Sequence, residues 1–464
     1  MQIKMFSLLA IICLLSINAE VPTHCGSLRC GAENRESGVG NRKSVRPQAR
    51  QNWRTRAQQT YYAGPGREQT PPTDINEVLI GYFGPNDVSH PEAGDMWRAA
   101  VLAVEEANHA GGCNGLPFHL VPGWSDSPWT AGATHVVRMA YLDKVWAIVG
   151  GVNGPSTHLA EQVVTKARIT LINPVSTDKT VNLANVPWMF SCVPADHIQA
   201  PVLAEAINRY LLMSQRQTGK YGITNLKSQI ENLKSQIALV SAVDHDSHLF
   251  AVELAKSFDQ YQIAPAFHFE FDPSRPTESW ITEIVEKILK ANPPVGGLVL
   301  IAGVRPSAQI VSALRQRGFD GAIFGGPSMG RRTFYEEAGE DAEGVIFPLL
   351  YPPGNSSRDD FEGKFAHRFG VHPDYTAAYT YDAVKLVIAA IRRAGLNRAQ
   401  IRDAVRGLAP YQGVTGIIDW DGLGSPRPVP GAVRIGTIKN GRVQPLSGTA
   451  SGAVTYRLPS SHLP

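Results

Sequence analysis

The chain has 464 residues, enough for two or three domains, and its 43% hydrophobic and 18% charged residues are usual for a soluble globular protein. The formal charge is +3, but residues 21–73 hold nine Lys and Arg against three Glu, so the remainder is mildly acidic. This balance gives no support to a nucleic-acid partner for the main body of the chain.

The first residues have the layout of a secretory signal peptide, residues 1–19. Lys4 precedes an almost wholly apolar segment, 6–17, and we expect cleavage after Ala19. The apolar segment is too short to span a membrane, and no later segment approaches the length of a spanning helix, so the mature protein is expected to be soluble and periplasmic or secreted. Residues 20–73 are rich in Gly, Pro, Gln, Ser and Arg, which predicts a disordered basic leader that adds nothing to the fold.

From residue 75 onward, strand and helix patterns alternate regularly. Strands or extended segments are predicted over 78–83, 118–121, 145–149, 169–172, 188–193, 237–243, 266–271, 297–301, 322–324 and 344–349. Helices are predicted over 96–108, 131–143, 156–167, 198–213, 247–260, 277–291, 306–317, 331–338, 357–369, 376–394 and 398–407. This order predicts an α/β protein with doubly wound parallel sheets, and the number of strands favours two lobes. A tandem repeat over 225–238 is interpreted as a duplication that lengthens a surface loop, with a short coiled element as the alternative.

Two motifs carry a resemblance to a known family. In the first, a Gly84-Pro85 loop follows the opening strand, and the next helix ends in E-x-N-x-x-G-G-x-N-G over 106–115. In the second, Tyr-Asp-Ala at 381–383 precedes G-x-x-G at 413–416 and Ile-Ile-Asp at 417–419. Together they closely resemble type I periplasmic binding proteins, in the branch that supplies branched-chain amino acids and amides to ABC transporters. The resemblance covers about residues 75–445.

The resemblance implies two lobes joined by three crossings, near Val193, near 347–351 and near 413–415. Lobe 1 would comprise 74–193 plus 350–413, lobe 2 would comprise 194–349 plus 414–445, and 446–464 would form a flexible tail. It also implies a non-enzymatic protein without a cofactor, which holds a small-molecule ligand between its lobes and docks on an ABC permease in the inner membrane. A ligand-sensing subunit of a signalling complex is the alternative, and a secreted hydrolase is the third reading.

Ligands of open parallel sheets lie beyond the carboxyl ends of the strands, so the loops there are the candidate site. Small residues allow close backbone approach, and helix N-termini offer free N–H groups to an anion. Ser156 and the Ser176-Thr177 pair can alternatively be plain helix caps. Family members often have Ser where this chain has Gly154, so a hydroxyl contact is lost there. The candidate ligand-binding residues are Asn86, Asp87, Asn153, Gly154, Ser156, Val175, Ser176, Thr177, Asp246, His248, Val304, Arg305 and Ser328.

The resemblance also bears on ligand charge. In the amino-acid binders the second lobe supplies a carboxylate and an aromatic residue, at the positions of Ser328 and Val304 here, and neither residue neutralises an ammonium group. Arg305 would instead pair with an anionic ligand or face solvent. We therefore expect amides or simple carboxylates to bind better than leucine or valine, unless Asp87, Asp244 or Asp246 supplies the missing charge.

Three further patterns point to other chemistry but are disfavoured. Residues 326–330 fit the G-x-S-x-G nucleophile elbow, yet no base is evident. Asp244, His245, Asp246 and His248 offer metal-ligand types, for which a polar rim or helix caps are the simpler reading. Residues 150–154 lack the first Gly of a dinucleotide fingerprint. After Cys13 leaves with the signal, Cys25, Cys30, Cys113 and Cys192 permit two disulfides with three pairings, which the sequence does not distinguish.

Overall fold

The computed structural model describes residues 62, 64–125, 131–217, 237–353 and 356–446, which belong to one unit spanning 51–464. The predicted signal peptide, most of the basic leader, most of the tandem repeat and nearly all of the C-terminal tail lie outside the described residues, as do Cys25 and Cys30. Within the described parts, all ten predicted strands form, and the α/β class with doubly wound parallel sheets is confirmed.

The first lobe is built on a five-stranded sheet, which is parallel throughout, in the order β2-β1-β3-β4-β5. Its strands are apolar and mostly buried on both faces, as parallel strands between two helix layers must be. Their bounds are β1 Val78–Phe83, β2 Phe118–Gly123, β3 Ala147–Gly150, β4 Thr170–Asn173 and β5 Met189–Ser191.

The second lobe is built on a seven-stranded sheet in the order β14-β13-β10-β9-β8-β6-β7. Its strands are β6 Ile237–Ala242, β7 Phe267–Phe271, β8 Gly297–Ile301, β9 Ala322–Gly325, β10 Ile346–Leu349, β13 Arg434–Lys439 and β14 Arg442–Pro445. The sheet is parallel except for β13 and β14, which the sequence analysis did not predict. They form a hairpin around Asn440-Gly441, whose positive φ angles of 52° and 66° suit this residue pair.

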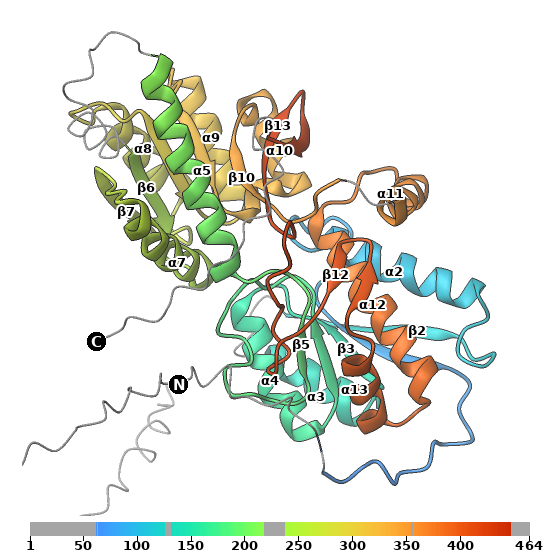
Figure 1. The fold of residues 1–464 in the computed structure, drawn as a ribbon. Helices are drawn as coiled ribbons and strands as arrows, with labels where there is room; N and C mark the ends of the chain where they lie inside the picture. Colours follow the sequence, from blue (N-terminus) through green and yellow to red (C-terminus); the bar gives the residue numbers. More distant parts are fainter. Residues whose placement is uncertain (1–61, 63, 126–130, 218–236, 354–355, 447–464) are drawn as a thin grey trace, which may run out of the picture. The chain divides into compact units, whose positions relative to one another are not determined.

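Helices connect the strands of both sheets. They are α2 Gly94–His109, α3 Ala133–Tyr141, α4 Gly154–Ala167, α5 Asp196–Gln217, α7 His245–Tyr261, α8 Thr277–Leu289, α9 Val304–Gln316, α10 Arg332–Ala338, α11 Ser356–Phe369, α12 Tyr375–Ala394 and α13 Arg398–Gly407, with short 3₁₀ turns η3 Pro327–Gly330 and η4 Gly339–Ala342. After β10 the chain returns to the first lobe, where the orange α12 lies against the cyan α2 (Figure 1). The alanine-rich face of α12 is buried there, because small side chains allow two helices to pack closely.

The Tyr-Asp-Ala motif of α12 holds the hairpin near which the third crossing between the lobes was predicted. The buried Asp382 carboxylate accepts hydrogen bonds from Val414 N (2.8 Å), Thr415 N (2.9 Å) and Thr415 Oγ1 (2.6 Å). These donors lie in the tight hairpin formed by β11 Tyr411–Gly413 and β12 Gly416–Ile418. Burial raises the pKa of Asp382 to about 6. The two parts of the second sequence motif therefore work together as one anchor.

The segment after this hairpin stays with the first lobe. Trp420 Nε1 donates to Ser191 O (2.8 Å), and the Trp420 ring lies 4.9 Å from that of Phe190 in β5. Ser191 N in turn donates to Gly424 O (2.9 Å). The other lobe boundaries stay predictions, but we propose that the last segment of lobe 2 begins after Arg427 rather than at residue 414.

The end of the predicted leader also packs on the first lobe. The Tyr62 ring lies 4.6 Å from the ring of the buried Trp188, and Asn397 Nδ2 donates to Gly66 O (2.7 Å) and Gln69 O (3.0 Å). Arg67 pairs with Asp403. The expectation that residues 20–73 add nothing to the fold is therefore wrong for Tyr62 and 64–69, because an apolar ring and backbone carbonyls suffice to dock a segment of non-periodic sequence.

Two chemical points complete the fold. Cys113 and Cys192 are buried free thiols, so these two do not pair with each other. Among the described helices, none has the length and apolar character needed to cross a membrane.

Candidate functional site

The first turn of α4 follows β3 and is built around a reciprocal cap. Asn153 Oδ1 accepts from Ser156 N (3.0 Å), and Ser156 Oγ accepts from Asn153 N (3.2 Å). This mutual bonding uses both side chains to terminate the helix. Ser156 therefore acts as part of a helix cap, which was the alternative expectation for this residue, and its hydroxyl already has a hydrogen-bond partner in the protein.

Gly154 in the same turn contacts the second lobe. Its backbone N–H donates to both oxygens of Asp246, at 3.0 and 3.2 Å, from the first turn of α7. A Cβ at residue 154 would lie 2.5 Å from Asp246 Oδ1, 2.7 Å from Asp178 Oδ2 and 2.8 Å from His245 Cδ2. A side chain at residue 154 would therefore push these groups away, so glycine permits their close approach.

The loop after β4 is organised by Asn173, whose amide group folds the chain back on itself. Its Oδ1 accepts from Val175 N (3.1 Å) and Ser176 N (2.9 Å), and its Nδ2 donates to Ser176 O (2.9 Å). The Ser176 hydroxyl is buried and has no hydrogen-bond partner among the described residues. Thr177 O accepts from Asp196 N (2.8 Å), at the start of α5. Ser176 thus carries an unsatisfied donor within the loop that the sequence analysis selected.

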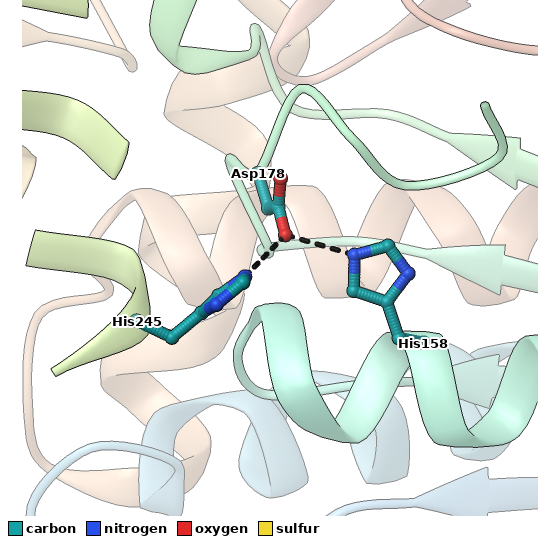
Figure 2. Close-up of side chains that lie close together, drawn as sticks. All are labelled: His158, Asp178 and His245. Carbon is teal, nitrogen blue, oxygen red and sulfur yellow. Dashed lines mark hydrogen bonds and ion pairs between the residues drawn. The ribbon is translucent and has the colours of Figure 1, made fainter. Parts of the chain in front are cut away.

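Three side chains from both lobes meet beside this loop (Figure 2). Asp178 Oδ2 lies 3.0 Å from His158 Nε2 of α4 and 2.8 Å from His245 Nε2 of α7. Hydrogen bonds to Asp178 and Glu161 raise the pKa of His158 to about 9. Burial alone would raise the pKa of Asp178, but hydrogen bonds from His158, Thr180 and His245 lower it below its usual range. The lobes are therefore linked by a carboxylate that accepts from two imidazoles.

Carboxyl groups outnumber their partners at this junction. Burial raises the pKa of Asp246 to about 7, and burial likewise raises the pKa of Asp196 well above its usual range. Asp196 is 1% exposed, and neither of its carboxyl oxygens has a hydrogen bond of normal geometry among the described residues. The sequence-based expectation about ligand charge assumed that hydrogen-bond donors outnumber acidic groups at the site. That assumption does not hold, because Asp178, Asp196 and Asp246 all lie beside the candidate loops.

Several predicted site residues do not take part in this junction. Asn86 and Asp87 are exposed, and Asp87 turns back to accept from Ser89 N and Oγ (both 2.8 Å). His248 lies outward on α7, 3.9 Å from Glu270. Of the four residues considered for a metal, only His245 joins the cluster in Figure 2, since Asp244 caps α7 through Ser247 N (3.1 Å).

The second-lobe candidates after β8 and β9 are also engaged elsewhere. Val304 is 3% exposed within the apolar core of the second lobe. Arg305 Nε pairs with Glu337 (3.0 Å), so its predicted role toward an anionic ligand has no support. Ser328 Oγ donates to Ala302 O (2.7 Å), which occupies the hydroxyl that a nucleophile elbow needs free to reach a base.

A separate contact between the lobes lies at α10. Arg332 binds the Asp95 carboxylate of α2 through Nε (2.9 Å) and Nη2 (3.0 Å), a bidentate pair. Arg331 Nε donates to Asp374 (2.7 Å), the cap of α12. These arginines were not predicted from the sequence, and neither were His158, Asp178 and Asp196. Only Asp178 had a usable signal, since it directly follows the predicted Ser176-Thr177 loop.

Comparisons with known proteins agree with this architecture. A family model described as periplasmic binding protein matches residues 80–442. The Pseudomonas aeruginosa protein named "Amino acid binding protein" is 25% identical over 360 residues, covering 75% of this chain and 87% of that protein.

Solved structures show the same fold. The branched-chain amino acid transporter substrate-binding protein LivJ of Streptococcus pneumoniae, in complex with isoleucine, superimposes with a TM-score of 0.66 at 21% identity, covering 79% of this chain and 97% of its own. A solute-binding protein of an ABC transporter from R. palustris, in complex with benzoate, gives 0.64 at 14% identity, covering 80% and 95%. These similarities do not favour the sensor or hydrolase readings.

Proposed function

Because this chain belongs to the periplasmic binding protein family and serves to bind a small solute rather than to transform one, we propose that its solute carries an ammonium group, as an amino acid or a close derivative does. The family acts outside the cytoplasm, and we propose that residues 1–19 direct export and that an ABC permease receives the solute. The proposal reverses the sequence-based preference for amides and simple carboxylates.

The charge of the junction carries this proposal. Burial raises the pKa values of the Asp246 and Asp196 carboxyl groups, and neighbouring acids add to this shift, so a positive charge would stabilise their charged forms. A ligand ammonium beside them would supply that charge, and an anionic ligand would add to the repulsion. The unpaired Ser176 hydroxyl offers a donor for a ligand carboxylate on the first-lobe side.

Closure follows from the distribution of these groups. Gly154 and Ser176 belong to the first lobe and Asp246 to the second, so a ligand that contacts all three is bound fully only when the lobes meet. In this arrangement Asp246 accepts a hydrogen bond from the Gly154 amide. We propose that a bound ligand replaces one of these two groups as the partner of the other.

A thermal-shift panel tests the proposal. The panel contains amino acids, the matching amides, the matching carboxylic acids without the amino group, and the matching amines. A ligand present at 100 times its Kd adds about 2.7 kcal/mol of stability, which such an assay detects readily. We expect amino acids to raise the melting temperature and the deaminated acids to have no effect. Stabilisation by the deaminated acids alone would restore the sequence-based expectation.

A further inference from the structure

His158, Asp178 and His245 form a cluster of a kind that the binding of an organic solute does not require. Two imidazole nitrogens, one from each lobe, converge on a single oxygen of Asp178 at 3.0 and 2.8 Å (Figure 2). All three ligand atoms lie within 4.8 Å of one another. Two imidazoles and a carboxylate are a frequent ligand set for transition-metal dications in proteins.

Neighbouring groups fix two of the three side chains in the orientation that a metal needs. Glu161 Oε2 lies 3.3 Å from His158 Nδ1, so it can hold the proton on that nitrogen. His158 Nε2 faces Asp178 Oδ2 (3.0 Å) and Thr180 Oγ1 (2.9 Å), and a metal that binds Nε2 displaces the proton from this nitrogen. Thr180 donates to Asp178 Oδ1 through its N (2.7 Å) and Oγ1 (2.6 Å), which leaves Oδ2 facing the imidazoles. Carboxylate–histidine pairs and hydrogen-bonded ligand carboxylates of this kind surround many metal sites.

We propose that His158, Asp178 and His245 bind one transition-metal dication, with Zn²⁺ the best match to the ligand set. Ligand atoms about 2 Å from one tetrahedral ion lie about 3.3 Å apart, close to the two nitrogen–oxygen distances of 2.8 and 3.0 Å. His245 must move toward His158 to complete the site. Its side chain is 42% exposed and stands at the first residue of α7, so it has room to rotate.

Metal binding at this cluster would act on the lobes themselves. His158 and Asp178 belong to the first lobe and His245 to the second, so the ion would hold the first turn of α7 against α4. It would do so without an organic solute, and it would favour the arrangement in which Asp246 meets the Gly154 amide. The cluster thus provides a metal-dependent control of lobe contact in addition to solute binding.

Calorimetry with Zn²⁺ on the chelator-treated full chain, without organic solute, tests the site. We expect one ion per chain in the wild type and at least about a 100-fold loss of affinity in His245→Ala, because one of three protein ligands is removed. His119→Ala is the control, since His119 is similarly exposed but pairs with Glu77 on the first lobe's edge strand. Glu161→Gln should weaken binding by roughly 10- to 100-fold.

A second measurement separates a designed site from surface binding. Zn²⁺ should raise the melting temperature of the wild type and of His119→Ala but not of His245→Ala, whereas Mg²⁺, which prefers oxygen ligands, should have no effect. The melting temperature of metal-free His245→Ala verifies that this variant folds. Equal Zn²⁺ affinity in the wild type and His245→Ala, or equal thermal shifts in both, would overturn the proposal.

Discussion

The pKa of Asp246 leads to a prediction about stability and pH. This carboxyl has a pKa of about 7 in the folded chain, against an ordinary value of 3.8, with burial as the main cause. Between these two values the folded chain keeps a proton that the unfolded chain releases. The free energy of unfolding therefore falls as the pH rises from about 4 to about 7.

The magnitude follows from the difference between the two pKa values. About three pKa units at 1.36 kcal/mol each give at most about 4 kcal/mol, and we expect about half of that because Asp246 is only partly buried. Asp246→Asn cannot ionise, while its amide oxygen can still accept from Gly154 N. The variant should therefore match the wild type near pH 4 and exceed it in stability at pH 8.

Thermal unfolding of both chains from pH 4.5 to pH 8 measures this effect. The melting temperature of Asp246→Asn minus that of the wild type should grow by roughly 2–3 °C across the range, because a folded unit of this size has a large entropy of unfolding. Titration of His158 and Asp178 occurs in both chains and largely cancels in the difference. A difference that stays flat, or that shrinks as the pH rises, would refute the reasoning that partial burial of Asp246 disfavours its charged form.

Two further predictions concern the fold. A chain that begins at Thr73 should have a free energy of unfolding about 2–4 kcal/mol lower than one that begins at Thr60, because it lacks the Tyr62–Trp188 ring contact and the Asn397 hydrogen bonds. In the chain that begins at Thr60, Tyr62→Ala alone should account for about 1–2 kcal/mol of this loss. Equal melting temperatures for the two truncated chains would show that this docking contributes nothing. Asp382→Ala should lower the free energy of unfolding, measured with denaturant, by about 2–4 kcal/mol, because three donors at the hairpin lose their acceptor. A loss below about 0.5 kcal/mol would mean that the hairpin does not depend on Asp382.

The sequence predicted the fold well because its signals were local and repeated. Apolar strands followed by amphipathic helices identify parallel sheets without long-range information, and the family motifs at 106–115 and 381–383 supported two lobes. The β13–β14 hairpin was missed although Asn440-Gly441 is a strong turn signal. Tyr62 was missed because docking by one ring leaves no periodic pattern in a sequence.

The candidate site was only partly predictable, since loop position does not determine which way a side chain points. Gly154, Ser176 and Asp246 were selected from their places after strands and do lie at the junction of the lobes. Val304 was selected by the same logic, but it lies in the apolar core. His158 stands one turn into a helix, and its approach to His245 depends on how two lobes meet, which no spacing along the chain encodes.

The most direct test of the proposed ligand chemistry is calorimetry with one matched pair. The pair comprises the amino acid that gives the largest thermal shift and the carboxylic acid of the same carbon skeleton without its amino group. We predict that the wild type binds the amino acid at least about tenfold more tightly, equivalent to about 1.4 kcal/mol, and that Asp246→Asn removes this preference. Equal or tighter binding of the deaminated acid by the wild type would contradict the proposal that the junction selects an ammonium group.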